Sequence, residues 1–193
     1  MNQEQQAILL KFYNNQYQTG YPNQWRESII VPIPKPNKIL TSPSSYRPIA
    51  LTNCMSKIME RMINRRLLHH LEDMNFFSPY QSGFRAGHSV SDALCRLEYA
   101  ARNAVLHRKY CVAVLLDINK AFDTVWHHGL FKKMEKLGIS GNLVRFIKEF
   151  LLARRVIVRY ENSLSSPFLL HAGSPAGLCT EPNTVQHLSL IHI

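Results

Sequence analysis

Hydrophobic residues recur at intervals of three and four positions in several parts of the chain. Over residues 54–74 they form one continuous stripe, and basic residues occupy much of the remaining surface. This spacing predicts a helix, because side chains three and four positions apart lie on the same helical face. Related patterns predict helices over residues 3–17, 127–137 and 142–152, and a further helix after Ser89, where Asp92 stands at the third position of a capping box.

Shorter apolar runs predict strands. Residues 110–116 are nearly all apolar, which is typical of a strand buried on both faces. Residues 155–160 alternate in character and predict a second strand. Residues 28–31 predict an edge or hairpin strand, because prolines follow at positions 32, 34 and 36 and cannot donate to a central ladder. With residues 41–45 as a polar loop, the order of elements indicates the α+β class.

The chain is basic: 23 lysines and arginines against 13 acidic residues give a net charge of +10. Such an excess attracts polyanions, of which nucleic acid is the usual one, although a soluble protein with a basic surface is the alternative. The hydrophobic share of 46% and the charged share of 19% exclude disordered, collagen-like and disulfide-scaffold classes.

The cysteines indicate a reducing, intracellular location. The four are widely scattered without a Cys-x-x-Cys pair, so we expect neither a zinc site nor a disulfide framework. The first residues lack the pattern of a signal peptide, and no apolar run approaches the roughly 20 residues that cross a bilayer. We therefore expect no membrane partner; the sequence does not distinguish nucleus from cytoplasm.

Asp117 is the first candidate for chemistry. It ends the apolar run of residues 110–116, and an acid held at the end of a buried strand can bind a hard cation such as Mg²⁺. Taken alone, an aspartate in this position more often caps an element or forms a turn. Its neighbours decide between these interpretations.

Four sequence blocks carry a resemblance to a known family. In chain order they are W-R-E-S-I-I-V-P-I-P-K-P-N-K (25–38), S-Y-R-P-I-A-L-T-N (45–53) with S-K-I-M-E-R (56–61), Q-S-G-F-R-A-G-H-S-V-S-D-A-L (81–94) and V-L-L-D-I-N-K-A-F-D-T-V (114–125). Together they resemble the reverse transcriptases of non-LTR retrotransposons, in particular the jockey-like elements. Four blocks in family order make the resemblance specific.

The resemblance implies the fold of a right-hand polymerase, of which this chain would contain the fingers and a partial palm. Residues 1–22 would form an N-terminal helix, 23–110 the fingers region, 111–172 part of the palm and 173–193 a degenerate tail. The implied reaction is template-directed DNA synthesis on RNA. Its partners would be an RNA template, a DNA primer and dNTPs, and its cofactor Mg²⁺.

The resemblance also implies roles around the aspartate. Asp117 would be a catalytic carboxylate of a two-metal site, and the main-chain carbonyl of Ile118 would be a further metal ligand. Phe122 occupies the position of the steric gate that rejects a ribose 2′-hydroxyl, although a core aromatic is an equal alternative without the motif. Asp123 directly follows the gate, and we interpret it as a structural turn or helix-start acid.

Basic residues of the earlier blocks match positions that contact nucleotide and template. Arg47 and Lys57 would bind the triphosphate of the incoming nucleotide; a solvated surface charge is the alternative for each. Arg85, in the block around Gly83, would position the template backbone, where basic groups and a close main-chain approach are needed.

Two further clusters have ordinary interpretations. His127 and His128 are adjacent, so on a helix their side chains diverge by roughly 100°, and surface or packing roles are expected rather than a metal site. Arg154, Arg155 and Arg159 lie on or beside a predicted strand. They would either contact nucleic acid or form an exposed basic strand.

The family pattern weakens in the block that begins at Gly173, where both glycines and the first proline are kept, and it ends after Gly177. The expected motif is G-V-P-Q-G-S-V-L-S-P, whereas this chain has G-S-P-A-G-L-C-T-E-P, with Ala176 in place of glutamine. Codons can be chosen for residues 173–188 that restore the family motif when read one base later, and glycine begins both readings. We interpret the tail as the product of a one-base slip just before Gly173, so residues 178–193 would not have been selected to fold.

The 193 residues do not contain the family's Y-A-D-D motif, and a single carboxylate cannot hold two divalent ions in the geometry that the reaction requires. We therefore expect no polymerase activity from this chain, with a non-catalytic nucleic-acid-binding remnant as the alternative. A phosphoryl-transfer or receiver-type domain that uses Asp117 as acceptor would require alternating β-α units and a phosphate loop. Neither is evident in the sequence.

Overall fold

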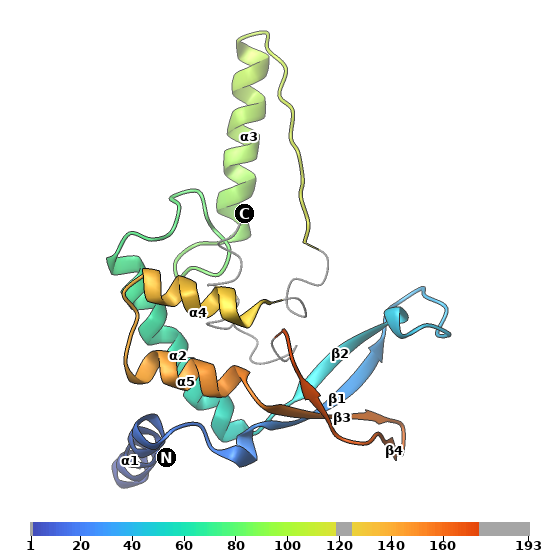
Figure 1. Ribbon diagram of the computed structural model, residues 1–193. Helices are drawn as coiled ribbons and strands as arrows, with labels where there is room; N and C mark the ends of the chain where they lie inside the picture. The colour runs from blue at the N-terminus through green and yellow to red at the C-terminus, as the bar shows by residue number, and fades with distance from the viewer. Residues whose placement is uncertain (1, 119–124, 174–193) are drawn as a thin grey trace. The chain divides into compact units, whose positions relative to one another are not determined.

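A computed structural model describes residues 2–118 and 125–173 (Figure 1). It confirms the α+β class. The elements in chain order are α1 (Gln3–Thr19), η1 (Asn23–Trp25), β1 (Glu27–Pro34), η2 (Pro43–Ser45), β2 (Tyr46–Leu51), α2 (Cys54–Asp73), α3 (Val90–Leu106), α4 (His127–Lys136), α5 (Asn142–Leu151), β3 (Arg154–Tyr160), β4 (Ser163–Leu164) and β5 (Phe168–Leu170), where η marks a short 3₁₀ helix.

These elements belong to two compact units. One consists of the described parts of Met1–Asn64 and Lys120–Ile193, and the other of the described part of Arg65–Asn119. Helix α2 runs through the boundary between them. The first unit contains the sheet and most of the core, while the second contains the end of α2, a long loop and α3.

The sheet of the first unit has the strand order β2-β1-β3-β4, and β5 also pairs with β3. Strands β1 and β2 form an antiparallel hairpin in which Pro32 lies opposite Pro48. The hairpin is confirmed, but the expected edge position is not, because β1 also pairs in parallel with β3 through residues 27–30. The prolines of β1 lie beyond this doubly paired segment, where the missing N–H donors disturb no second neighbour.

The helices predicted from residues 54–74, 127–137 and 142–152 are confirmed as α2, α4 and α5. Their apolar stripes explain the core: α2 buries Met59 and Ile63 in the first unit, and α5 buries Phe146, Ile147 and Phe150. Helices α4 and α5 are neighbours in the first unit (Figure 1).

Tyr21 lies at the centre of this core. Its ring makes edge contacts with Trp25, Phe146 and Phe150 at centroid distances of 5.5, 5.3 and 5.6 Å. Its hydroxyl oxygen lies 2.6 Å from Ser56 Oγ and 3.2 Å from the carbonyl oxygen of Trp25, and its single proton serves one of these two partners. The aromatic cluster is therefore tied to the first turn of α2.

Two buried ionisable residues, Glu60 and Arg154, lie next to these hydrogen bonds. Ser56 Oγ donates to Glu60 Oε1 at 2.6 Å, and both Glu60 and Arg154 are buried. Burial raises the pKa of the Glu60 carboxyl to about 7, although the hydrogen bond from Ser56 and the charge of Arg154 oppose the shift. Arg154 donates from Nη1 to the carbonyl oxygen of Phe150 at 3.1 Å and lies over the Phe150 ring.

The burial of Arg154 corrects one interpretation of the sequence. Its side chain is 1% exposed, so it cannot form the nucleic-acid contact considered for the arginine cluster. Arg155 and Arg159 are exposed, and for them a nucleic-acid contact stays a prediction. The alternation along β3 explains the difference, because Arg154 points to the same face of the sheet as the buried Val156.

The strand predicted over residues 110–116 is wrong for this structure. The segment has no regular structure, and Tyr110 and Leu115 are 98% and 94% exposed. The stripe expected on the helix after Ser89 is likewise exposed on α3, at Leu94, Leu97 and Val105. An apolar pattern predicts burial but does not supply a partner, and no described strand pairs with residues 110–116.

The raised pKa of Glu60 predicts a pH-dependent stability. The folded chain holds this proton more tightly than the unfolded chain, whose ordinary pKa is 4.5. The stabilisation is therefore complete below about pH 4.5 and is lost as the pH rises through about 7. We expect Glu60→Gln to remove this loss, which is on the order of 3 kcal/mol. Urea unfolding at a series of pH values measures it.

Glu161→Gln is the matched control, because it removes an exposed carboxylate from the turn after β3. We expect the pH dependence of unfolding in this control to follow that of the unchanged chain. If Glu60→Gln also left the dependence unchanged between about pH 5 and 8, the buried carboxyl would not be its source.

Candidate functional site

The predicted nucleotide-binding residues lie on consecutive elements of the first unit. Arg47 is exposed on β2, opposite Ile33 of β1. Lys57 is half-buried in the first turns of α2. Between them Asn53 begins the helix, since its Oδ1 accepts a hydrogen bond from the Met55 N–H at 2.8 Å. The block 45–53 is therefore a strand with its helix cap, which fixes the chain between the two basic residues.

The predicted catalytic residue lies in the second unit. Asp117 and Ile118 are exposed and follow the irregular segment 110–116. Phe122 and Asp123 lie outside the described residues, so the predicted steric gate stays a prediction. Within residues 2–118 and 125–173, no group of three or more His, Cys, Asp or Glu side chains could hold a metal ion. The oxygen donors of Asp117 and Ile118 suit Mg²⁺ in kind but do not complete a site.

A main-chain latch connects two blocks that are far apart in the sequence. The Gly173 N–H donates to the Val125 carbonyl at 3.2 Å, and the His127 ring lies with Nε2 2.7 Å from the Gly173 carbonyl oxygen. His127 is buried, which confirms its packing role. The block that ends at Val125 and the divergent block that begins at Gly173 therefore meet at the start of α4.

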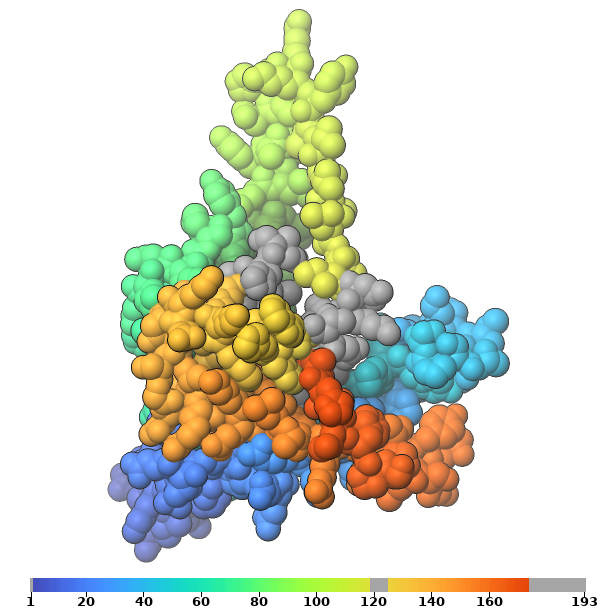
Figure 2. Space-filling model, in the orientation of Figure 1, coloured from blue at the N-terminus to red at the C-terminus, as the bar shows by residue number. Residues whose placement is uncertain are grey.

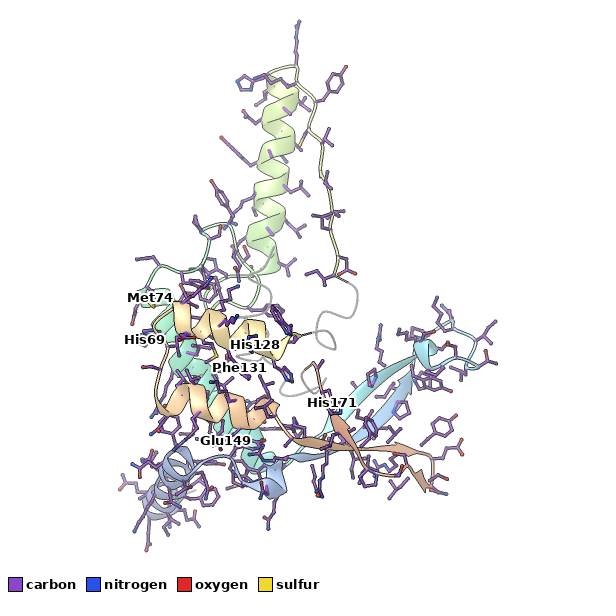
Figure 3. The ribbon with its side chains drawn as sticks, in the orientation of Figure 1. His69, Met74, His128, Phe131, Glu149 and His171 are labelled. Atoms are coloured by element: carbon purple, nitrogen blue, oxygen red, sulfur yellow. The ribbon has the colours of Figure 1, made fainter. Side chains whose placement is uncertain are left out.

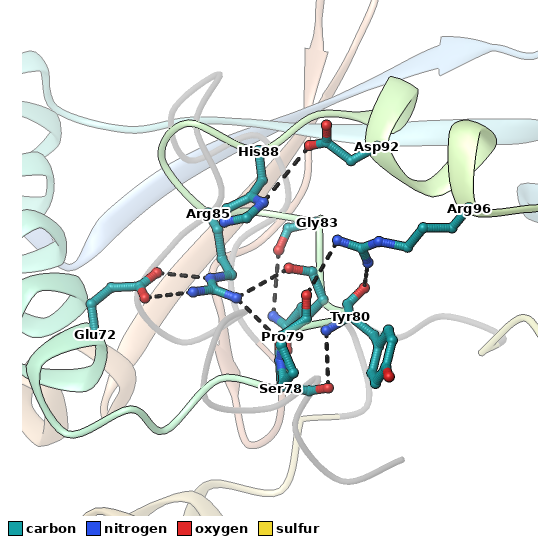
Figure 4. Close-up of polar contacts among 10 residues, drawn as sticks. Glu72, Ser78, Pro79, Tyr80, Gly83, Arg85, His88, Asp92 and Arg96 are labelled. Carbon is teal, nitrogen blue, oxygen red and sulfur yellow. Dashed lines mark hydrogen bonds and ion pairs between the residues drawn. The ribbon is translucent and has the colours of Figure 1, made fainter. Parts of the chain in front are cut away.

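The loop of residues 78–88, in the second unit, is held by Arg85 (Figure 4). Arg85 donates from Nε and Nη2 to the two carboxylate oxygens of Glu72 at 2.8 and 2.7 Å. Its Nη1 donates to the carbonyl oxygens of Ser78 and Gln81, and its guanidinium lies over the Phe77 ring. With its side chain 13% exposed, Arg85 fastens the loop to the end of α2.

A second arginine, which the sequence analysis missed, holds the same loop from α3. Arg96 donates to the carbonyl oxygens of Tyr80 and Pro79 at 2.6 and 3.2 Å, and its guanidinium lies over the Tyr80 ring. These partners are sixteen and seventeen positions away, so no helical or strand periodicity could have indicated them. The capping box at the start of α3 was predictable, and Asp92 accepts from the Ser89 N–H at 2.7 Å.

The glycines of this loop leave its main chain open. A side-chain carbon added at Gly83 or Gly87 would meet nothing within 4 Å. Gly87 also has a φ of +75°, a conformation that side chains disfavour. The two arginines thus shape a loop whose main chain is accessible at both glycines, as the close approach of a phosphate backbone would require.

Comparison with known proteins gives a consistent family. The profile of the family described as "Reverse transcriptase (RNA-dependent DNA polymerase)" matches residues 33–188. The chain is 40% identical over 162 residues to a "Probable RNA-directed DNA polymerase from transposon BS" of Drosophila melanogaster, covering 84% of this chain and 18% of that protein. It is 35% identical over 176 residues to the "RNA-directed DNA polymerase from mobile element jockey" of the same species, covering 91% and 19%.

A more distant relative is the "Retrovirus-related Pol polyprotein from type-1 retrotransposable element R2" of Popillia japonica. It is 27% identical over 180 residues, and the match covers 84% of this chain and 24% of that protein. The chain thus spans about a fifth of the length of the first two curated relatives. What the printed names describe belongs to those longer proteins.

The geometry around Arg85 predicts that the several hydrogen bonds of its guanidinium group contribute more to stability than its charge does. Arg85→Lys keeps the charge but cannot form the paired bonds to Glu72 and the two carbonyls. We expect it to lower the free energy of unfolding by about 2 kcal/mol. Arg102→Lys is the control, because Arg102 pairs with Glu98 on the exposed face of α3 and should change stability by less than about 0.5 kcal/mol. Equal effects in urea unfolding would contradict the prediction.

Proposed function

The chain belongs to the reverse transcriptase (RNA-dependent DNA polymerase) family, and we propose that it contributes the fingers region and part of the palm to a retrotransposon polymerase that copies RNA into DNA. One observation carries the proposal: the family profile spans residues 33–188 and includes most of the four sequence blocks in their expected order. The relatives from transposon BS and from mobile element jockey are both named as RNA-directed DNA polymerases. That this chain takes part in copying RNA into DNA is our proposal.

The incoming dNTP would be bound through Arg47 and Lys57. Arg47 is exposed on β2 and makes no hydrogen bond or ion pair with the described residues, so its guanidinium is available for a triphosphate. Lys57 lies on α2, which Asn53 begins directly after β2. The end of β2 therefore sets the position of Lys57. The buried chain Tyr21–Ser56–Glu60 would hold this part of α2 while phosphate charge binds nearby.

In the proposed reaction the primer 3′-hydroxyl attacks the α-phosphate of the dNTP, and pyrophosphate leaves. Reverse transcriptases are a family that uses divalent metal ions, and Mg²⁺ bound by the Asp117 carboxylate and the Ile118 carbonyl would supply positive charge for this step. Phe122 would lie under the sugar and exclude a 2′-hydroxyl group. Asp117 is the single carboxylate assigned to the metal, so we propose that this chain does not polymerise by itself.

The template would contact the loop of residues 78–88. The open main chain at Gly83 and Gly87 and the basic residues around this loop support this contact with the template. Arg85 would act mainly by shaping the loop, because Glu72 and two carbonyl oxygens already occupy its donors. The basic net charge of +10 supports a polyanionic partner.

The proposal keeps the division expected from the resemblance: 1–22 an N-terminal helix, 23–110 the fingers region, 111–172 part of the palm and 173–193 a frame-shifted tail. Residues 174–193 lie outside the described residues, and sequencing of the locus tests the frame slip.

We also propose an intracellular location. The exposed free thiols of Cys54, Cys95 and Cys111 support it; none of the described helices is long and apolar enough to cross a bilayer.

The proposed function predicts Mg²⁺-dependent binding of dNTP and salt-sensitive binding of primed RNA by the 193-residue chain. We expect Arg47→Gln and Lys57→Gln each to weaken dNTP binding about tenfold, or about 1.4 kcal/mol. Fluorescence anisotropy with labelled dNTP and with a DNA-primed RNA template measures both. Lys11→Gln is the control, because it removes an exposed charge from α1, outside all four blocks.

Two outcomes would contradict different parts of the proposal. Failure to bind either dNTP or primed RNA would contradict the function itself. Incorporation of dNTP by the chain alone, abolished by Asp117→Asn, would contradict only the absence of activity.

A further inference from the structure

We propose that the groove between α4 and α5 binds single-stranded nucleic acid, with a base stacked on Trp126 and the phosphates held by Lys132 and Lys148. This surface lies on elements to which the proposed function gives no task. The inference rests on the proposed function only in taking nucleic acid as the partner.

The groove has a volume of about 780 Å³. Its lining combines an apolar floor, with Phe131 and Val144 among its residues, and basic side chains that include His128, Lys132 and Lys148. Figure 3 shows His128 and Phe131 on α4 and Glu149 on α5, and Figure 2 shows the surface of these helices in yellow and orange. The Lys148 ammonium lies 5.4 Å from the centre of the Phe131 ring, so a cation and an aromatic surface stand together.

Internal contacts occupy two of the charged residues in this lining. Arg145 donates to the carbonyl oxygens of Tyr17 and Gln18. Glu149 accepts from the Tyr21 N–H at 2.6 Å. Arg145 therefore fastens the end of α1 to α5, Glu149 fastens the segment that follows α1, and the two form an ion pair at 4.0 Å in which their charges offset. Among the other lining residues that the structure describes, Glu135 is the one acid, beside the cations Lys132 and Lys148. The groove thus favours an anionic ligand.

Trp126 provides an aromatic face beside His128, one of the residues that line the groove. It is 67% exposed, although an indole ring normally favours burial. Gly129 allows its ring to pack against the first turn of α4, because a side-chain carbon there would lie 2.4 Å from an atom of the indole ring. The Trp126 ring centre is 5.7 Å from that of His128, which lines the groove. The ring is thus supported from one side and largely open to solvent.

An exposed aromatic ring beside spaced lysines suits a nucleic-acid strand better than an acidic peptide. Each base offers a π-face for stacking and each nucleotide brings one phosphate, so rings and cations are both used. An acidic peptide would use the lysines but leave the Trp126 ring without a matching group. The excess of basic residues over the whole chain points the same way.

The two tryptophans allow a direct test. Trp25 is 4% exposed and Trp126 is 67% exposed, so the long-wavelength part of the fluorescence reports on Trp126. We expect a short oligouridylate to quench this component, and we expect Trp126→Ala to weaken binding about tenfold. Replacing Lys132 and Lys148 by glutamine should lower the salt dependence of log Kd by about 1.4, or about 0.7 for each cation.

Lys11→Gln, on the exposed side of α1, is the matched charge control and should bind like the unchanged chain. Urea unfolding of each variant checks that it folds. Oligouridylate binding that the groove variants do not change would overturn the inference, as would displacement of oligouridylate by polyglutamate at lower concentration.

The proposed function is judged separately, by the effect of Arg47→Gln and Lys57→Gln on dNTP binding. If those variants behave as expected and the groove variants do not, the groove inference alone fails. If oligouridylate still quenches Trp126 while the chain does not bind dNTP, the proposed function fails and the groove stands.

Discussion

The hydroxyl group of Tyr21 is buried among aromatic rings, and the fold of the first unit depends on giving it partners there. An unpaired hydroxyl in such surroundings costs about 1–3 kcal/mol. Ser56 forms a hydrogen bond with this hydroxyl group and donates a hydrogen bond to Glu60. Glu60 in turn lies in the field of Arg154 from β3. Hydrogen bonds and the charge of Arg154 thus connect three segments that are distant in the sequence inside an apolar cluster.

This arrangement explains the composition of one of the sequence blocks. In S-K-I-M-E-R, Ser56 and Glu60 are one helical turn apart and face the core, while Lys57 lies between them on a different face. The block therefore combines a structural pair with a candidate phosphate ligand. Sequence similarity alone cannot separate these roles, because both kinds of residue are part of the same motif.

Much of the fold could be predicted from the sequence, because periodic burial decides it locally. The stripes of α2, α4 and α5, the capping role of Asp92 and the β1–β2 hairpin all follow from neighbours within a few positions. The place of β1 inside the sheet did not follow, since its pairing with β3 joins residues more than a hundred positions apart. The strand predicted over residues 110–116 was wrong because an apolar pattern does not specify a pairing partner. For the site, the motifs indicated candidate residues, whereas the role of Arg96 depends on a loop path that no spacing encodes.

The latch at Gly173 bears on what the proposed one-base slip would change. Both of its contacts involve only the main chain of Gly173: the N–H bonds Val125 and the carbonyl meets the His127 ring. The contacts use no side chain at that position, although its φ of +80° favours glycine. Under the codons that restore the family motif, glycine would begin both readings. A lesion of the reading frame at this point would therefore be silent for the latch itself.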